Sequence, residues 1–550
     1  MRAFGILVLW LCSAAVLAQI AVAPSPLRLA DRTGPDWGTA LAFDPLAYRA
    51  LKTANGRVLL RGFPLDAGRK VNLELQRFEV FSAHTQLVVV YPDGERRLPF
   101  PDVVLLRGKV QDEPDSEVYL GLSPHLSNGW INRGDERHMI STRDGITTIT
   151  DLRTLPTQPA SNWTCEALIP PYTDSHADNE VRIESVGPRI ASIAVETDRE
   201  FTLLRFSNNP TRAAEYVAEL YGAMTFIYER DVQTRLVVTY LRLWMTNDPW
   251  DKASSGDQLS QYRDYWVNNM AHIPRALGHF LSARNLGGGV AWVGVVCNPW
   301  WGFGLSGNIN GYFNPSLEPH WSNWDIFVVA HETGHNFGTL HTHDGYNPPI
   351  DTCGLGCNDP PFVGTIMSYC HTCPGGMWNI LLQFHPRVIE RILYYLQYEA
   401  GCNLTRARVT GTVDLQYYLG DPVGFMGGLE LRNPGTRTIR YLDYPALDAN
   451  RRFTSSWLAD CGDYDAWLYW ETYLGKTVPN IVVAAPSIDL SVLLTAGDAD
   501  YTNVVDIADL TLVLASLGTG PGQGDLNWDG AVDLSDLNIV LINFGKQGDN

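Results

Sequence analysis

The segment at residues 331–341 constrains the fold of this 550-residue chain more than any other stretch, because its residues cooperate only on a helix that ends in a turn. It reads His-Glu-Thr-Gly-His-Asn-Phe-Gly-Thr-Leu-His and follows a short apolar run. Ser322 and Asp325 offer a capping box, which predicts that a helix begins there. On that helix His331 and His335 stand four residues apart, so their imidazoles project from one face and can share a metal ion.

The rest of the segment completes a candidate zinc site. Glu332 lies beside the two histidines, where its carboxylate can take a proton from a metal-bound water. Gly338 lets the chain leave the helix, since glycine accepts a positive φ without a Cβ clash, and His341 can then swing back as a third ligand. Three neutral imidazoles and one water form an open tetrahedral site that lowers the pKa of the water towards ~7. The alternative is three unrelated histidines on a buried helix. With only 13 His in the chain, however, the chance of finding five fixed residues at this spacing is on the order of 10⁻⁵.

The sequence around this motif alternates between strand and helix patterns. Strands are predicted at residues 191–196, 236–243 and 287–297. Helices are predicted at residues 211–230 and 258–284, the second with a break at Pro274. We therefore expect an α/β (α+β) domain over residues 189–402.

With a second motif, this region resembles the metzincin metallopeptidases, and more narrowly their reprolysin (adamalysin-like) branch. The resemblance rests on the helix motif, on His-Asn-Phe-Gly within it, and on Gly-Thr-Ile-Met-Ser-Tyr at residues 364–369, which resembles the Met-turn under the zinc. Residues 288–297 resemble the strand that such enzymes pair with an extended peptide substrate. The resemblance implies a zinc endopeptidase that hydrolyses peptide bonds in proteins, with Glu332 as general base. It also implies a bond between Cys297 and Cys402, and two local bridges among Cys353, Cys357, Cys370 and Cys373.

The sequence departs from the reprolysin pattern at two points. Reprolysins usually place Asp directly after the third His, whereas Thr342 and His343 precede Asp344 here. His343 is therefore an alternative ligand, although the spacing already favours His341. Tyr369 follows the Met-turn methionine by two residues, as in astacins and serralysins, where this tyrosine approaches the zinc. It is a candidate fifth ligand or oxyanion stabiliser, with core packing as the alternative and an astacin- or serralysin-like site as the rival within the enzyme class.

The N-terminus has the pattern of an export signal, which predicts a secreted, extracellular protein. Arg2 is followed by an apolar core and by Val-Leu-Ala at residues 16–18, a small-residue cleavage site. An N-terminal membrane anchor is the alternative, but the apolar run is short for a span of ~20 residues. Loss of Cys12 with the signal leaves eight cysteines, an even number typical of disulfides outside the cell. A structural zinc knuckle built from the Cys353–Cys357 and Cys370–Cys373 pairs is a weaker reading.

Residues 19–188 are rich in alternating β patterns, and they resemble the propeptides that precede reprolysin domains. A Pro-rich, polar stretch at residues 154–178 has the composition of a linker. Such propeptides often place a cysteine thiolate on the zinc, and Cys165 is the cysteine positioned for this role. A disulfide to Cys461 is the competing interpretation.

Two similar Asp-rich loops near the C-terminus predict calcium (Ca²⁺) sites. Side-chain oxygens at loop positions 1, 3, 5, 9 and 12 can wrap a hard cation, and an apolar helix pattern follows each loop. Asp at position 12 departs from the EF-hand glutamate but resembles type I dockerin modules, which implies docking to a cohesin-like partner. A calcium module that only adds stability is the alternative. The candidate ligands are Asp498, Asp500, Thr502, Asp506 and Asp509 in the first loop and Asp525, Asn527, Asp529, Asp533 and Asp536 in the second.

The net charge of -19 argues against a nucleic-acid partner and against docking on anionic membranes. We expect a signal peptide (1–18), a β-rich propeptide (19–188), a metzincin catalytic domain (189–402), a β-sandwich (403–495) and a small all-α calcium-binding tail (496–546). This organisation predicts a secreted zinc (Zn²⁺) endopeptidase made as a zymogen. The alternative from another class is an extracellular, calcium-dependent scaffold or adhesion protein with an inactive peptidase-like domain.

Overall fold

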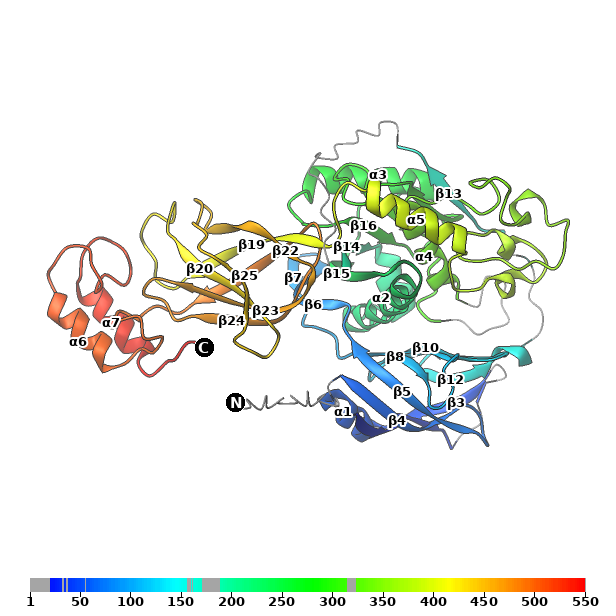
Figure 1. Cartoon of the computed structure of the whole chain (residues 1–550), viewed down its shortest axis with the longest axis horizontal. Coiled ribbons are helices and arrows are strands. Elements are labelled where there is room, and N and C mark those ends of the chain that lie inside the picture. Colours follow the sequence, from blue (N-terminus) through cyan, green and yellow to red (C-terminus); the bar gives the residue numbers. More distant parts are fainter. Residues whose placement is uncertain are drawn as a thin grey trace, which may run out of the picture.

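The computed structural model describes residues 20–31, 34–35, 38–54, 56–155, 160, 162–170, 188–313 and 323–549 of the chain (Figure 1). The predicted export signal at residues 1–18 lies outside these residues. Among the described helices, none combines the length and the apolar character that a membrane crossing requires.

An N-terminal sheet of ten strands forms the lower layer in Figure 1. Its order is β1-β4-β5-β8-β9-β10-β11-β12-β3-β2, and helix α1 (Pro45–Thr53) packs beside β1. One face buries a separate apolar core that includes Leu60, Phe63 and Leu106. The strands are β1 (Ala21–Pro24), β2 (Leu27–Leu29), β3 (Thr39–Phe43), β4 (Arg57–Pro64), β5 (Lys70–Phe78), β8 (Val104–Val110), β9 (Glu117–Leu122), β10 (Ser127–Arg133), β11 (Glu136–Arg143) and β12 (Ile146–Asp151).

A second sheet of eight strands carries the predicted metal motif on one side. Its order is β13-β17-β18-β16-β14-β15-β6-β7. Strand β17 runs antiparallel to β18, whereas β14 pairs in parallel with β15 and β16, and β16 pairs in parallel with β18. The strands are β6 (Phe81–Tyr91), β7 (Gly94–Arg97), β13 (Thr164–Leu168), β14 (Arg189–Thr197), β15 (Thr234–Trp244), β16 (Leu277–Leu281), β17 (Gly288–Trp292) and β18 (Phe303–Ser306). The helices are α2 (Pro210–Val232), α3 (Ser255–Asn269), α4 (Trp324–Asn336) and α5 (Pro386–Tyr398).

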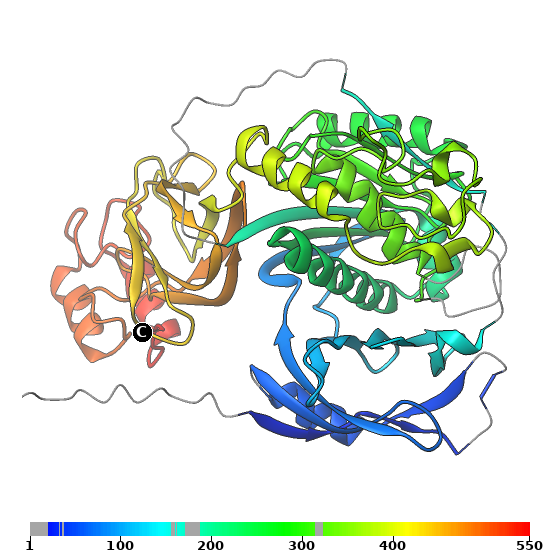
Figure 2. The ribbon, with the colours of Figure 1, turned by 45° about the vertical axis from the view of Figure 1, so that its right-hand side comes forward.

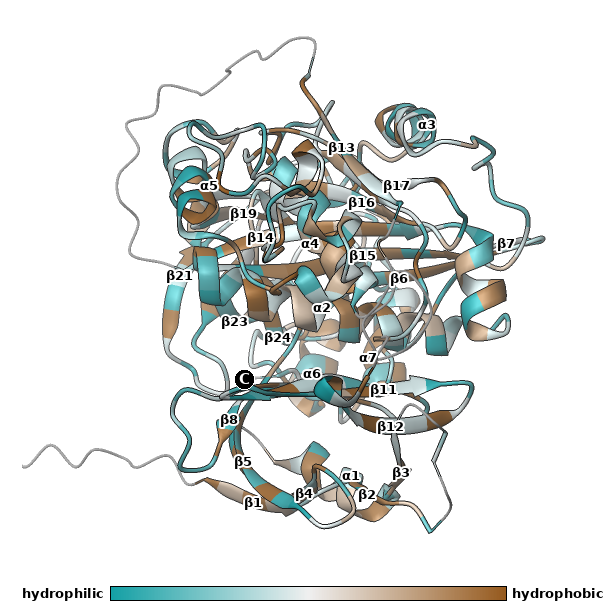
Figure 3. Cartoon of the chain, turned by 90° about the vertical axis from the view of Figure 1, so that its right-hand side faces the viewer, coloured by the Kyte–Doolittle hydropathy of each residue, from teal (hydrophilic) through white to brown (hydrophobic). Residues whose placement is uncertain are grey.

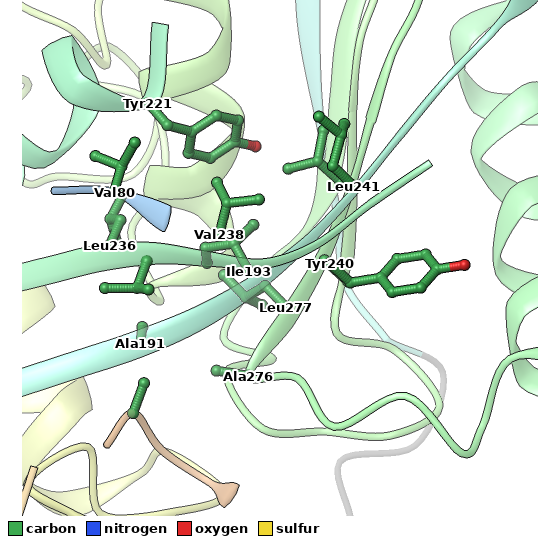
Figure 4. Close-up of a cluster of buried hydrophobic side chains, with 14 of the residues drawn as sticks. Val80, Ala191, Ile193, Tyr221, Leu236, Val238, Tyr240, Leu241, Ala276 and Leu277 are labelled. Atoms are coloured by element: carbon green, nitrogen blue, oxygen red, sulfur yellow. The ribbon is translucent and has the colours of Figure 1, made fainter. Parts of the chain in front are cut away.

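The core of this sheet lies between its strands and helix α2. Ile193, Leu236, Val238 and Leu277 converge there with Tyr221 from the helix (Figure 4). Brown, hydrophobic stretches mark the central strands β14 and β15 in Figure 3. Such continuous apolar runs are typical of parallel strands that are covered on both faces.

The alternating pattern predicted this domain well except over residues 270–284, and the strand predicted at residues 287–297 is present as β17 (Gly288–Trp292). Helix α2 and strands β14 and β15 match the predictions, but residues 277–281 form strand β16 rather than the second half of a helix. All five residues of β16 are buried, so the run Leu-Gly-His-Phe-Leu reflects burial on both faces and has no helical period. Gly278 lies so close to the ring of Phe303 that a Cβ there would be only 2.7 Å from the ring.

Strands that precede residue 188 pair with both edges of the second sheet. Strand β6 pairs in parallel with β15, and Figure 2 shows this light-blue segment rising from the N-terminal sheet into the second one. At the other edge β13 pairs in parallel with β17. The prediction of a linker was therefore wrong for residues 164–168, because the free N–H and C=O groups of β17 recruit this short segment as an edge strand. Strands from both sides of the predicted boundary at residue 188 share one sheet.

Residues 406–494 fold into two further sheets. One has the order β22-β19-β25 and the other β21-β20-β23-β24. The backbone N–H of Val482 donates to Ser82 Oγ at 3.0 Å, which links these sheets to β6. The strands are β19 (Arg406–Leu415), β20 (Gly427–Arg432), β21 (Ile439–Asp443), β22 (Arg452–Asp460), β23 (Gly462–Trp470), β24 (Lys476–Val483) and β25 (Ser487–Leu494).

The C-terminal tail contains two helices, α6 (Ile507–Ser516) and α7 (Leu534–Asn543), each preceded by one of the Asp-rich loops. The tail packs on the neighbouring sheets through Trp528, whose ring centroid lies 4.6 Å from that of Phe425. The backbone N–H of Leu419 also donates to the carbonyl of Asn527 at 2.7 Å. The loop and helix pattern predicted for the tail is thus present twice.

Candidate metal centre

Helix α4 holds the first two histidines of the motif, and its start differs from the prediction. Asn323 is the N-cap residue, in a left-handed conformation and without a side-chain cap. Asp325 does not form a capping box, since its buried carboxylate accepts from Tyr216 Oη at 2.6 Å and from the N–H of Asn310 at 2.9 Å. Ser322 lies outside the described residues. The carboxylate of Asp325 therefore fixes the helix against α2 rather than capping it.

The three predicted ligands meet at their Nε2 atoms. His335 Nε2 lies 3.1 Å from His331 Nε2 and 3.1 Å from His341 Nε2, and all three side chains are buried. Three nitrogens bound to one tetrahedral zinc at ~2.0–2.1 Å would lie ~3.3 Å apart. The donor set and its spacing therefore fit zinc.

The other nitrogen of each ring faces an acceptor, which fixes the tautomer. His331 Nδ1 lies 2.6 Å from the carbonyl of Ile366, and His335 Nδ1 lies 2.8 Å from the carbonyl of Thr339. His341 Nδ1 faces Asp344 Oδ2 at 3.4 Å. Because each Nδ1–H donates outward, each Nε2 lone pair points to the shared centre. Burial lowers the pKa of His335 and of His341 to about 3, so these imidazoles are neutral and able to bind a metal.

Two tight contacts shape the floor below the histidines. Gly338 has a φ of 85°, as predicted, and it turns the chain so that His341 faces the helix. A Cβ at Gly334 would lie only 2.7 Å from the sulfur of Met367, so this glycine lets the Met-turn approach the helix. The backbone N–H of Thr342 donates to the carbonyl of Met367 at 3.0 Å and joins the third histidine segment to the same turn.

Glu332 is a buried carboxylate beside this centre. Neither of its oxygens accepts an N–H or O–H hydrogen bond from the described part of the chain. Burial raises the pKa of this carboxyl group well above its ordinary value. Gly289 on β17 lies directly against it, and a Cβ at that position would clash with Oε1. A buried oxygen with no such donor is what a general base requires if its partner is a water bound to the metal.

Cys165 on β13 reaches the same place from the other side. A carboxylate oxygen of Glu332, a ring nitrogen of His331 and the Cys165 sulfur lie within 4.8 Å of one another. Cys165 is the register partner of Gly289, and its thiol is buried and free. Cys461 is also free, so the alternative of a bridge between Cys165 and Cys461 is wrong.

Tyr369 lies over the third histidine and also forms hydrogen bonds with the backbone of Cys165. Its ring centroid is 4.6 Å from that of His341, and its hydroxyl accepts from the backbone N–H of Cys165 at 3.1 Å. The same hydroxyl donates to the Cys165 carbonyl. His343 stacks on His341 with ring planes 6° apart and lies beside Asp344, away from the cluster of three Nε2 atoms.

The disulfides match the pairing that the resemblance implies. Cys297 bonds to Cys402, which ties the loop after β17 to the end of the domain. The other four cysteines form two local bridges, so the zinc knuckle interpretation is wrong. The local bridges are Cys353–Cys370 and Cys357–Cys373.

The two tail loops repeat one hydrogen-bond pattern. The Asp at position 1 accepts from the N–H groups at positions 5 and 6, and the Asp at position 12 accepts from those at positions 2, 3 and 9. Position 6 has a positive φ in both loops, 66° at Asn503 and 96° at Gly530. Position 9, Asp506 or Asp533, is the N-cap of the following helix. The carboxylates of Asp498, Asp500 and Asp509 lie within 4.8 Å of one another.

In the second loop the side chains at positions 3 and 5 contact each other. The Asn527 amide donates to Asp529 Oδ2 at 2.9 Å, and it also donates to Ser535 Oγ. In the first loop Thr502 Oγ1 donates to Asp500 Oδ1 at 2.8 Å, again between positions 5 and 3. The predicted ligands therefore lie on one loop framework in each repeat.

Sequence reasoning missed the roles of Gly289 and Asp344. A Gly-Gly pair in a predicted strand signals a close backbone approach, but only the fold identifies Glu332 as the neighbour. Asp344 stands three residues after His341, a spacing at which a carboxylate can orient the Nδ1 of the histidine. No sequence pattern predicted Asn323 as the N-cap of α4, since its side chain makes no cap hydrogen bond.

Comparison with known proteins places this site in a peptidase-related segment. Residues 187–379 match the model of Metallo-peptidase family M12, which implies zinc. No curated protein matches the chain. Among solved structures, metalloproteinase-II from Bacteroides fragilis has 12% identity and a TM-score of 0.36, covering 64% of this chain and 95% of that one.

Two further solved structures are type II cohesin–X-dockerin complexes from Acetivibrio cellulolyticus, with interface mutations. One has 24% identity and a TM-score of 0.22, and the other 23% identity and a TM-score of 0.21. Each match covers 26% of this chain and 97% of the other.

Proposed function

We propose that this protein is a secreted zinc endopeptidase, made as a zymogen, that hydrolyses peptide bonds in proteins with Glu332 as general base. One observation carries the proposal: the buried Glu332 carboxylate, which accepts no N–H or O–H hydrogen bond from the described residues, lies on the helix that presents two of three converging Nε2 atoms. The match of residues 187–379 to a metallopeptidase family supports it.

Zinc would be held by His331, His335 and His341, and the fourth position would stay open. A zinc ion held there supplies Lewis acidity, which lowers the pKa of a water ligand and polarises a carbonyl. The outward Nδ1–H bonds keep the three rings oriented for this task.

The chain's own residues supply the proton transfers. Glu332 takes a proton from the attacking water as the new C–O bond forms, and returns it to the amine as the C–N bond breaks. Gly289 keeps β17 close to Glu332, so a peptide paired with β17 passes over the carboxylate. The Tyr369 hydroxyl already donates to a peptide carbonyl, that of Cys165, and can donate in the same way to a substrate oxygen that gains charge.

The position of β13 supports latency. Its five residues pair with β17, the edge that a peptide substrate would use, and its Cys165 thiol reaches the His331 and Glu332 side chains. A thiolate is a zinc ligand, so Cys165 can take the open fourth position. In this proposal, activity requires the release of β13 from the edge of β17.

The test compares wild type with Glu332→Ala after β13 has been released by limited proteolysis. Glu332→Ala should bind one zinc per chain, as wild type does, and cleave casein at least ~10³-fold more slowly. Glu390→Ala is the matched control, since Glu390 is exposed on α5. Casein cleavage by Glu332→Ala at the wild-type rate would refute the general-base assignment.

For the tail we propose two calcium ions, one in each Asp-rich loop, and docking to a cohesin-like partner. The repeated loop framework and the positive φ at position 6 in both loops support cation binding. Calcium titration of wild type and of Asp498→Asn/Asp525→Asn tests the sites: wild type should bind two ions and the double variant neither with comparable affinity. If both bind alike, the ions are not held by these loops.

A calcium-dependent scaffold with an inactive peptidase-like domain is the second candidate. The contacts of the tail with the neighbouring sheets, such as Trp528 against Phe425, are compatible with a module that only adds stability. The complete set of three histidines and Glu332 counts against an inactive domain, since a scaffold has no use for all four. Chelator-sensitive cleavage after activation separates the two candidates.

A further inference from the structure

Two buried carboxylates of helix α2 face the N-terminal sheet. The helix contacts both β15 and β9, and Figure 1 shows it above β8 and β10. Glu215 and Glu219 stand one turn apart on this helix and are 1% and 0% exposed. Within the described part of the chain, every side chain that hydrogen-bonds to these carboxylates comes from the segment of β9 and β10: Ser123 and His125 after β9, and Asn128 on β10.

Glu219 has one hydrogen-bond donor for its two carboxylate oxygens. Asn128 Nδ2 donates to Oε2 at 2.5 Å, while Asn128 Oδ1 accepts from the backbone N–H of Phe313 at 3.2 Å, so this amide is fixed in orientation. Oε1 accepts no hydrogen bond from the described residues. An ionised carboxylate offers about four acceptor sites, and burying them without donors costs free energy. The site therefore suits a neutral carboxyl group better than a charged one.

The surroundings of Glu219 are tightly packed. A Cβ on Gly121 of β9 would lie 2.6 Å from Glu219 Cγ. The buried Tyr119 hydroxyl donates to the backbone carbonyl of Glu219 and not to its carboxylate. Burial raises the pKa of the Glu219 carboxyl group well above its ordinary value, the Asn128 hydrogen bond offsets part of this rise, and the Glu215 charge adds to it. Burial and a neighbouring like charge therefore both favour the protonated form.

Glu215 differs from Glu219 in having partners that balance its charge. Its carboxylate lies 2.9 Å from His125 Nδ1 and accepts from Ser123 Oγ at 3.1 Å. The charge of Arg212, three residues earlier on α2, also acts on it. In the described part of the molecule, Glu219 has no such cation. The other titratable groups that face the two carboxylates are the hydroxyls of Tyr48, Tyr119 and Tyr216.

We propose that Glu219 is a proton-operated lock between the N-terminal sheet and α2: the sheet docks tightly while this carboxyl group is protonated and loosens when it is ionised. The inference rests on the proposed zymogen, in which the N-terminal region keeps the enzyme latent. Water reaches Glu219 once the sheet lifts from the helix, so the docked state binds a proton that the loosened state releases. This contribution to docking is fully present below the pKa of a water-exposed glutamate, ~4.3, and is lost as the pH rises through the higher pKa of the docked state.

The test follows hydrogen exchange of the backbone amides of β9 and β10 in the unprocessed chain, read by mass spectrometry. Each rate is divided by the intrinsic exchange rate at the same pH, so that the readout is the docking of the sheet. In wild type, protection should fall at least about tenfold between about pH 5 and pH 9. Glu219→Gln stays neutral and keeps the shape of the side chain, so its protection should change less than about twofold. Equal pH dependence of the two proteins would overturn the proposal and leave the proposed peptidase function intact.

Three further variants separate Glu219 from its neighbours. Glu215→Gln removes the like charge, so the fall in protection should shift to lower pH by at least about 0.5 unit. An unshifted profile in this variant would contradict the proposal, whether or not Glu219→Gln folds. His125→Gln removes the imidazole that contacts Glu215 and should keep the pH dependence of wild type, whereas a flat profile would assign the effect to His125 and overturn the proposal. Glu390→Gln, at an exposed position of α5, is the control and should match wild type.

Discussion

The Tyr369 hydroxyl forms two hydrogen bonds with the backbone of Cys165: it accepts from the N–H at 3.1 Å and donates to the carbonyl. One side chain after the Met-turn thus holds the residue whose thiol reaches the metal centre. The contact joins the segment that blocks the site to a group that can later act on a substrate. It gives Tyr369 a role in the unprocessed chain that core packing alone would not.

Tyr369→Phe should loosen β13 and slow the activated enzyme. The variant loses both hydrogen bonds, each worth about 1 kcal/mol, so labelling of Cys165 in the unprocessed chain should become about 30-fold faster. After activation, kcat should fall by about 10–100-fold with zinc content unchanged, because a donor to the substrate oxygen is missing. Tyr394→Phe, on the exposed side of α5, is the control. An unchanged labelling rate and kcat would return Tyr369 to a packing role.

Gly289→Ala should disable the activated enzyme without removing the metal. The added Cβ would clash with Glu332 Oε1, so the carboxylate must move away from the centre. We expect kcat/KM to fall at least about 100-fold, since catalysis depends on the position of the base. Gly520→Ala is the control, because no atom lies within 4 Å of that Cβ position. Zinc analysis and casein cleavage check both variants, and a fully active Gly289→Ala would contradict the geometry.

Removal of residues 1–188 should leave a chain that does not fold. Strand β6 lies between β15 and β7 and buries Leu87, Val88 and Val89 in the core that the metal-site domain uses. Without it, the edge of β15 and this core are exposed to water, which favours aggregation. The measurement is size-exclusion chromatography of residues 189–550 expressed alone.

Cleavage between β13 and β14 tests the same relationship in the full chain. After limited proteolysis, the N-terminal fragment should co-elute with the C-terminal one, held by β6. A monomeric, cooperatively melting 189–550 fragment would show that β6 is dispensable.

Calcium should stabilise the tail more at neutral than at acidic pH. Burial, with the Asp509 charge nearby, raises the pKa of Asp498 to about 6, above its ordinary 3.8. Between pH 3.8 and about 6 the calcium-free folded chain therefore binds a proton on Asp498 that the unfolded chain has released. The stability that this proton contributes is fully present below pH 3.8 and is lost as the pH rises through about 6. Calcium needs the deprotonated carboxylate. We expect millimolar calcium to raise the Tm by about 5 °C near pH 7.5 and by less than about 2 °C near pH 5.

The variant Asp498→Asn separates this effect from general charge screening. In this variant the first loop should contribute little to the calcium-dependent rise in Tm at either pH. The part of the rise that comes from the second loop should be unchanged. A calcium response that is equal at both pH values would contradict the role given to Asp498.

The sequence was informative where structure is local. Helix α4, the positive φ of Gly338 and the repeated loops all follow from short-range patterns of residue type. Strand β16 was misjudged because a five-residue run that is buried on both faces has no period. The pairing of β13 with β17 and of β6 with β15 joins segments far apart in the chain, and edge complementarity of this kind leaves no mark in a local pattern.

The candidate site also combines residues that a local pattern predicts with residues that only the fold brings together. His331, Glu332 and His335 come from one helix and are predictable from their spacing alone. The neighbours that tune them, Gly289 and Cys165, come from two strands that meet only in the fold. Their identity needed the register of the sheet.

Chelation and reconstitution of the activated protein tests the central claim most directly. Casein cleavage should be lost when the chelator removes about one zinc per chain and should return when one equivalent of zinc is added, while His335→Ala should neither rebind zinc nor recover. Cleavage that persists after zinc is removed, or that returns in His335→Ala, would contradict a zinc centre built from His331, His335 and His341.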